Sequence, residues 1–200
     1  MASSEVQICN NALIKLGANT ITSLSDDSKA ARLCNNVYSI MRDDMLRGHP
    51  WNFAITRTTL AKLSTTPAFK YSYEYQLPSD CLRVIGIKDT NAEYRIEGRK
   101  LLTDENSVSL IYIKRITDTS QFDANFANAL AFKLASELAY AITNNATLAS
   151  NLGQEAERLL RRAKMHDAQE DSMYVIQTDA LTGARSGFGI GGIVFESEDD

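Results

Sequence analysis

The sequence predicts an α+β protein: an antiparallel four-helix bundle of two N-terminal and two C-terminal helices, an inserted small antiparallel β-sheet, and an extended C-terminal arm. Apolar residues recur every three or four positions in both outer parts of the chain, and every second position between them. All three prolines lie in that middle stretch, and five of the ten glycines lie after residue 180. These patterns predict a helical domain of 1–50 and 117–173, a sheet domain of 51–116 and an arm of 174–200.

The first two helices follow from their caps and apolar spacing. Ser3 or Ser4 is a suitable N-cap for the first helix, which ends at Gly17. For the second helix we expect Ser25 as the N-cap and an end at 48–50, the Gly-His-Pro sequence. Its predicted buried stripe consists of Ala30, Leu33 or Cys34, Val37, Met41 and Met45. The short loop between the two helices makes them antiparallel neighbours.

The middle stretch predicts a small antiparallel sheet. Four aromatic residues alternate with polar ones and place their rings on one strand face: Phe69, Tyr71, Tyr73 and Tyr75. Pro78 ends that strand, and further strands are expected at 81–88, 94–97, 100–103 and 108–116, the last apolar on both faces and therefore central. The aromatic row fits a face packed on helices or on another subunit, and it also fits stacking on bases or sugars.

The third and fourth helices differ in polarity. The third, within 120–143, is apolar on nearly all sides and must be covered by its own domain or by a neighbouring subunit. The fourth, about 148–173, is rich in charge and is expected to be solvated or to form an interface. The arm combines flexible glycines with isolated apolar residues and an acidic end, a pattern typical of a segment that becomes ordered on a partner.

Composition excludes several classes of protein. Lys and Arg number 21 against 25 Asp and Glu, a formal charge of −4, whereas domains that bind free nucleic acid usually carry a basic excess. No apolar run is long enough for a membrane helix, and the first residues do not resemble a secretory signal, so we expect a soluble protein without membrane contact. The three cysteines are odd in number, widely spaced and without a Cys-x-x-Cys pair. We therefore expect them to be reduced and buried, without a zinc site.

No motif predicts catalysis, a cofactor or a metal. The glycine run at 183–192 lacks the strand-to-helix context of a phosphate cradle. His49 is expected to cap the carbonyl groups at a helix end, and His166 to be solvated. Glycoside hydrolysis would need two convergent carboxylates, and the sequence singles out no such pair; Glu137 is one carboxylate with which to test it.

Several phrases of the sequence, in this order, together resemble the tail tubular protein A family, the head-to-tail adaptors (connectors) of short-tailed bacteriophages. The resemblance covers residues 6–172. The phrases are ALIKLGA, SDDSKAARLCNNVY, HPWNFA, YEYQLPSDCLRV, YRIEGRKLLTDE and NALAFKLASELAYAIT.

The resemblance implies a structural protein of the virion tail, assembled in the bacterial cytoplasm. Such adaptors form a ring, usually of twelve copies, between the portal protein and the tail nozzle (tail tubular protein B), and double-stranded DNA passes through the lumen without sequence-specific binding. An acidic chain fits a DNA conduit, and the apolar third helix would supply lateral contacts. No catalytic residue, cofactor or metal is implied.

The residues expected at interfaces fall into three groups. They are the arm anchors Phe188, Ile190, Ile193 and Phe195, the polar contacts Arg158, Arg161 and Arg162, and the structural or contact aromatics Trp51, Phe53 and Tyr73.

The sequence is also compatible with two other functions. The alternative is an adaptor with a secondary peptidoglycan or polysaccharide hydrolase activity. A third possibility is a module that binds DNA ends through basic residues gathered around the sheet, for which the candidates are Lys62, Lys70, Arg83, Lys88, Arg95, Arg99 and Lys100.

Overall fold

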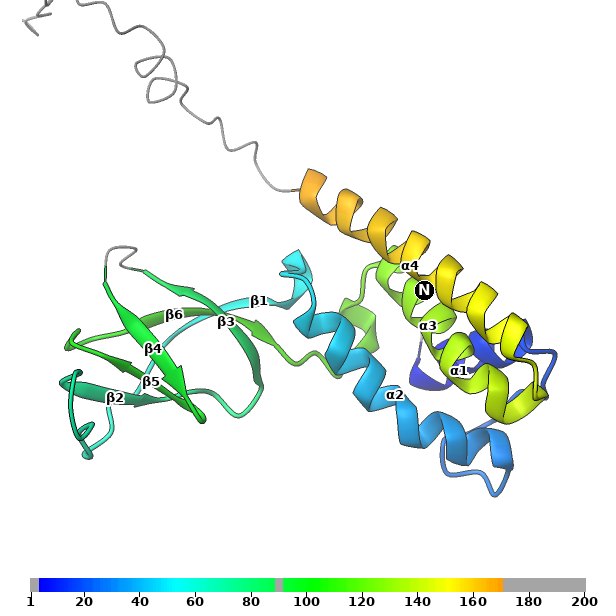
Figure 1. Ribbon diagram of the computed structural model, residues 1–200, viewed down its shortest axis with the longest axis horizontal. Helices are drawn as coiled ribbons and strands as arrows, with labels where there is room; N and C mark the ends of the chain where they lie inside the picture. The colour runs from blue at the N-terminus through cyan, green and yellow to red at the C-terminus, as the bar shows by residue number, and fades with distance from the viewer. Residues whose placement is uncertain (1–3, 89–91, 171–200) are drawn as a thin grey trace, which may run out of the picture.

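The computed structural model describes residues 4–88 and 92–170. Within them the protein is α+β, with four α-helices and two small antiparallel sheets; the helices gather at one end of the molecule and the strands at the other (Figure 1). The helices are α1 (Glu5–Lys15), α2 (Lys29–Arg47), α3 (Ala124–Thr143) and α4 (Ala146–Gln169). The strands are β1 (Ile55–Thr59), β2 (Tyr73–Gln76), β3 (Cys81–Ile87), β4 (Tyr94–Glu97), β5 (Lys100–Thr103) and β6 (Ser109–Lys114). The predicted arm, 174–200, lies outside the described residues.

The caps of the first two helices show what local sequence can and cannot fix. Ser4 caps α1 by accepting a hydrogen bond from the backbone N–H of Gln7 at 3.1 Å, and Gly17 adopts φ +66° just after the helix, as its position predicted. The prediction of Ser25 as the second cap was wrong, because α2 begins three residues later with Ser28 as its cap. The carboxylate of Asp26 instead accepts hydrogen bonds from the N–H groups of Thr22 and Ser23 and closes the preceding loop.

The predicted stripe of α2 does face the core, but only part of it is fully buried. Cys34 and Met45 are buried as predicted, whereas Ala30, Leu33, Val37 and Met41 are half-buried and pack against the core. The buried residues are Ala31, Cys34, Tyr38, Arg42, Met45 and Leu46. Ala31, Tyr38, Arg42 and Leu46 each follow a predicted position directly, so the centre of the buried face lies about one position beyond the predicted one.

The strands form two sheets, where the sequence predicted one. In the first the order is β1-β6-β3, so β6 is central as predicted; in the second the order is β2-β5-β4. Both are antiparallel, and β4 and β5 form a hairpin that turns at Gly98 with φ +58°. Tyr75 from β2 and Leu101 from β5 share an apolar core with Leu110 from β6, so the two sheets cover one another. Pairing between distant strands has no local sequence signal, which is why the split was not foreseen.

The row of four aromatic residues does not lie on one strand face. The strand β2 contains only its last two members; Tyr75 is buried and Tyr73 half-buried. Tyr71 is also buried, in the loop before the strand, whereas Phe69 is 83% exposed. Lys70 between them has φ +73°, and this left-handed conformation breaks the alternation.

The helix α3 lies against all three other helices. Its eight buried residues are Phe126, Ala129, Leu130, Ala131, Leu134, Ala135, Leu138 and Ala139. The nearly uniform apolar character of this helix is therefore satisfied within its own chain. Of its large apolar side chains only Tyr140 is exposed, at 62%, and the expectation that α3 supplies the lateral contacts of a ring stays a prediction. None of the helices among the described residues is long and apolar enough to span a membrane.

Candidate interaction surface

The helix α4 has the smallest share of buried residues of the four α-helices. It is 24 residues long, yet only Ala156 and Ala163 are buried, and these two small side chains allow close packing on α3. Leu159 and Leu160 are half-buried beside them. Most of the helix circumference therefore faces outward.

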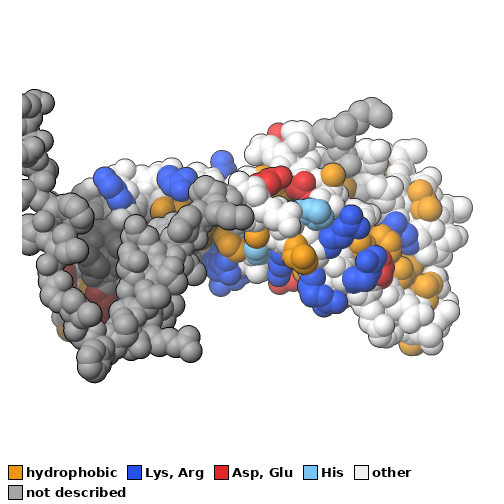
Figure 2. Space-filling model, turned by 90° about the horizontal axis from the view of Figure 1, so that it is seen from above, with side chains coloured by type: hydrophobic (Ala, Val, Ile, Leu, Met, Phe, Trp, Pro, Cys, Tyr) orange, Lys and Arg blue, Asp and Glu red, His pale blue; other side chains and the backbone are white. Residues whose placement is uncertain are grey.

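A basic face, defined as Arg158, Arg161, Arg162 and Lys164, occupies the second half of α4. Residues 158–166 contain these four cations and no acidic residue. The three arginines are exposed, and Met165, which is 65% exposed, lies among them. Seen from above, basic side chains gather over the helical part with apolar ones between them (Figure 2). Such a mixture of arginine and apolar side chains is typical of protein interfaces.

The ion pairs of α4 leave part of this face free. Arg158 donates to Glu155 at 2.8 Å, and Glu157 pairs with Lys133 of α3 at 3.7 Å. Arg161 and Arg162 make no ion pair with any of the residues that the structure describes.

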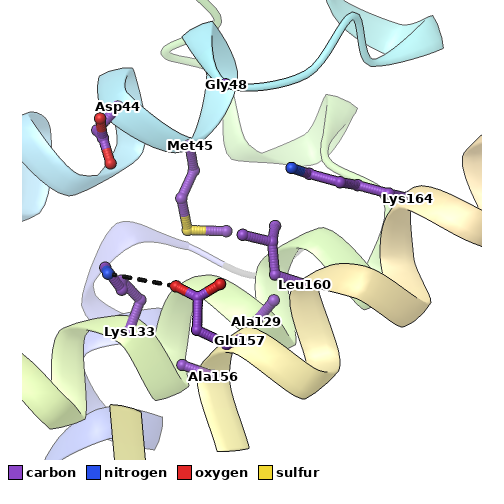
Figure 3. A pocket seen from close by; sticks show the side chains of 9 residues that line it. All are labelled: Asp44, Met45, Gly48, Ala129, Lys133, Ala156, Glu157, Leu160 and Lys164. Atoms are coloured by element: carbon purple, nitrogen blue, oxygen red, sulfur yellow. Dashed lines mark ion pairs between the residues drawn. The ribbon is translucent and has the colours of Figure 1, made fainter. Parts of the chain in front are cut away.

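A small pocket opens beside the basic face, between α2, α3 and α4 (Figure 3). Its volume is about 120 Å³, the order of size that suits one apolar side chain. Met45, Ala129, Ala156 and Leu160 provide apolar walls, while Asp44, Lys133, Glu157 and Lys164 supply charge. The pocket therefore combines an apolar interior with a charged rim that includes one member of the basic face.

The end of α4 is tied to the segment that leads into the sheets. The Asp167 carboxylate accepts a hydrogen bond from the backbone N–H of Asn52 at 3.0 Å and lies 3.0 Å from His49 Nε2. The Asn52 amide donates back to the Asp167 carbonyl at 2.8 Å. Since the Asp167 side chain is only 9% exposed, these bonds are sheltered from water. The prediction that His49 caps helix carbonyls was wrong: its partner is a carboxylate 118 residues away.

The aromatic residues singled out from sequence occupy different places. Trp51 is fully buried, donates from Nε1 to the Met45 carbonyl at 2.9 Å, and packs edge-on against Phe126. Phe53 is half-buried in the same cluster. Tyr73 lies apart in the sheets, where the Lys62 ammonium sits 3.4 Å from its ring centre. Trp51 therefore has a structural place in this chain, and the structure does not bring the three together.

The seven basic residues considered for DNA binding are partly engaged by acidic neighbours. Lys70 pairs with Glu93 at 3.2 Å, Lys100 with Glu74 at 2.6 Å, and Arg95 with Glu97 at 3.6 Å. These pairs reduce the uncompensated positive charge that phosphate binding requires. His166 is exposed, as expected.

One hollow on the sheets contains two carboxylates, Glu74 and Glu97, beside Phe69 and Tyr71. A glycosidase needs one carboxyl group with a raised pKa to act as general acid. The pKa of Glu74 is instead lowered, because Lys100 and Thr65 donate hydrogen bonds to its carboxylate. Among the described residues, every carboxylate with a shifted pKa has it lowered. Glu137 is exposed on α3 and lines none of the pockets described above.

The acidic residues that would suit the lining of a DNA channel are unevenly distributed along the chain. Residues 171–200 hold six of the 25 acidic residues and one of the 21 basic ones, a net charge of −5. The preceding residues therefore carry +1. The acidity expected of a channel lining belongs to this segment and not to the helices and sheets.

The three arginines were among the predicted contact residues, whereas Lys164, Met165 and Asp167 were not. The absence of acidic residues from 158–166 is a signal that could have marked the whole basic face. Nothing in the sequence links Asp167 to Asn52. The anchors Phe188, Ile190, Ile193 and Phe195 lie outside the described residues. Comparison with family models and with curated proteins found no match to the chain.

Proposed function

We propose that the protein is a head-to-tail adaptor of a short-tailed bacteriophage, as the resemblance to the tail tubular protein A family implies. In this role it is a non-catalytic virion protein that forms a ring, of twelve copies by the resemblance, between portal and tail nozzle. We also propose the detailed fold that the resemblance implies: a four-helix bundle with an inserted sheet region and a C-terminal arm.

The observation that carries the proposal is the basic face of α4. Arg161 and Arg162 are exposed without acidic partners among the described residues, beside the exposed Met165 and an apolar pocket. Arginines next to apolar side chains are typical anchors of protein–protein contacts. No comparable set of groups favours hydrolysis, because Glu74, the less exposed of the two carboxylates in the hollow on the sheets, has its pKa lowered by Lys100.

The test is to mix the full chain with portal rings encoded by the same phage and to image the product. We expect decorated rings with the wild-type chain. The double variant Arg161→Glu/Arg162→Glu should bind at least about tenfold more weakly, as expected for losing interface arginines. The matched control Arg32→Glu/Lys88→Glu makes the same change of charge at exposed positions outside the basic face and should decorate normally.

Three outcomes would count against the proposal. They are the absence of any association with portal rings, equal losses in the two double variants, and release of reducing sugar from peptidoglycan by the wild-type chain that Glu74→Gln abolishes. A monomer in the absence of portal decides nothing, since a portal ring can act as the template for assembly.

A further inference from the structure

The described part of the chain ends beside a surface whose charge is opposite to that of the residues that follow. The basic face carries four cations on α4, and the segment 171–200 has a net charge of −5. Within that segment the charge is concentrated at the end, where Glu196, Glu198, Asp199 and Asp200 follow directly after three apolar residues.

The pattern of the segment matches the pattern of the surface. An apolar group of Ile193, Val194 and Phe195 precedes the four acids, and the pocket of about 120 Å³ lies beside the basic face. Lys164 belongs to both, since it lines the pocket and lies within one helical turn of Arg161. One extended stretch of eight residues can place an apolar side chain in the pocket and acidic groups over the arginines.

We propose that residues 193–200 dock on the α4 surface of their own chain, with an apolar side chain in the pocket and the acidic residues on the basic face. The docked segment covers Met165 and supplies Arg161 and Arg162 with carboxylate partners. This inference stands apart from the proposed function, because it requires only the chain itself.

Chain length favours the same chain over a second copy as the source of the segment. From residue 170 back to Leu160 the helix rises about 15 Å. The 25 residues that connect residue 170 to Phe195 span about 25–30 Å as a flexible chain, so the pocket is within easy reach. A tether of this length gives an effective concentration of the order of millimolar, far above the concentration of other copies in dilute solution.

Docking in the same chain has a consequence for any partner of α4. A partner that binds the basic face must displace residues 193–200. Only a partner that binds more tightly than this segment can therefore occupy the surface. Residues 193–200 then act as a weak ligand within the chain and keep other acidic ligands from binding the exposed arginines unspecifically.

The experiment is zero-length carbodiimide cross-linking of the full chain, followed by digestion and mass spectrometry. The reagent joins carboxylates to lysines in direct contact. An equal mixture of ¹⁴N and ¹⁵N chains separates links within a chain from links between copies. We expect links from the peptide that contains Glu196–Asp200 to Lys164 and Lys133, in pure isotope pairs, with fewer links at high salt.

Variants that keep both lysines test the contact itself. Arg161→Ala/Arg162→Ala should lower the yield of these links about fivefold, as expected for losing two exposed ion pairs of ordinary strength. Phe195→Ser should also lower it, while Arg32→Ala/Arg57→Ala, a pair of exposed arginines elsewhere, should leave it unchanged. Mixed-isotope links, links spread evenly over lysines such as Lys29, Lys62 and Lys114, or yields that the first two variants leave unchanged would overturn the proposal.

Discussion

The helices α3 and α4 are neighbours in sequence, pack on each other and have similar lengths, but they differ strongly in how much of their surface is exposed to solvent. Eight of the 20 residues of α3 are buried, and its exposed side holds only one large apolar residue, Tyr140. Only two of the 24 residues of α4 are buried, and both are alanines. The two helices therefore contribute differently to the structure. The helix α3 forms part of the core, whereas α4 packs on α3 through a narrow stripe and leaves the rest of its surface exposed.

This division predicts where substitutions should be tolerated. Of these two helices, α3 contributes most of the buried apolar area, and burial of apolar surface is the dominant favourable contribution to folding. The charged side chains of α4 remain in water, where ion pairs contribute little to stability. Most of α4 can therefore be shaped by binding requirements without loss of the fold.

The largest effect is expected from a cavity in α3. Leu134→Ala removes a side chain with no exposure, and we expect the free energy of unfolding to fall by about 2–5 kcal/mol. The matched truncation on α4 is Met165→Ala, which should change it by less than about 0.5 kcal/mol because that side chain is 65% exposed. Urea denaturation followed by circular dichroism measures both. Similar losses in the two variants would remove the contrast between the helices.

The contrast between α3 and α4 was visible in the sequence, because helix periodicity and polarity are local properties. The same holds for Ser4 and Gly17 at the ends of α1, and for the central place of β6. The start of α2 was misplaced because both Ser25 and Ser28 precede it, and the choice depends on how Asp26 is used in the loop.

What the sequence did not yield depends on contacts between distant segments. The division of the strands into two sheets requires knowing that β2 pairs with β5, and the link between His49 and Asp167 joins residues far apart in the chain. Of the candidate surface, the three arginines were predicted, whereas the pocket next to them requires α2, α3 and α4 to meet. The composition of the whole chain gives its net charge, but it does not show that the excess of acidic residues lies after residue 170.

An intermediate effect is expected at Asp167, a sheltered polar side chain near the end of α4. Asp167→Ala removes the acceptor for the Asn52 N–H and the partner of His49 in a sheltered place. We expect a loss of about 1–3 kcal/mol in the free energy of unfolding. Glu170→Ala, an exposed acidic residue at the same helix end, is the control and should have little effect. A loss for Asp167→Ala no larger than for the control would mean that the end of α4 is not anchored through this carboxylate.

The smallest effect is expected on the outer side of α4, and it depends on pH. Hydrogen bonds from Arg158 lower the pKa of Glu155 below its ordinary value of 4.5. Because the folded-state pKa is the lower one, the pair stabilises the fold above the ordinary value, and this contribution is lost as the pH falls through the lowered pKa. Glu155→Gln should therefore shift the urea midpoint slightly downward at about pH 7, and the shift should shrink as the pH falls below 4.5.

Water screens this exposed pair, so the shift at neutral pH should be far smaller than that of Leu134→Ala. A shift of comparable size would show that α4 stabilises the fold through its outer charges as α3 does through its buried apolar residues. The basic face could not then be assigned to binding alone. A small shift leaves those charges free to serve a ligand, since their removal costs the isolated fold almost nothing.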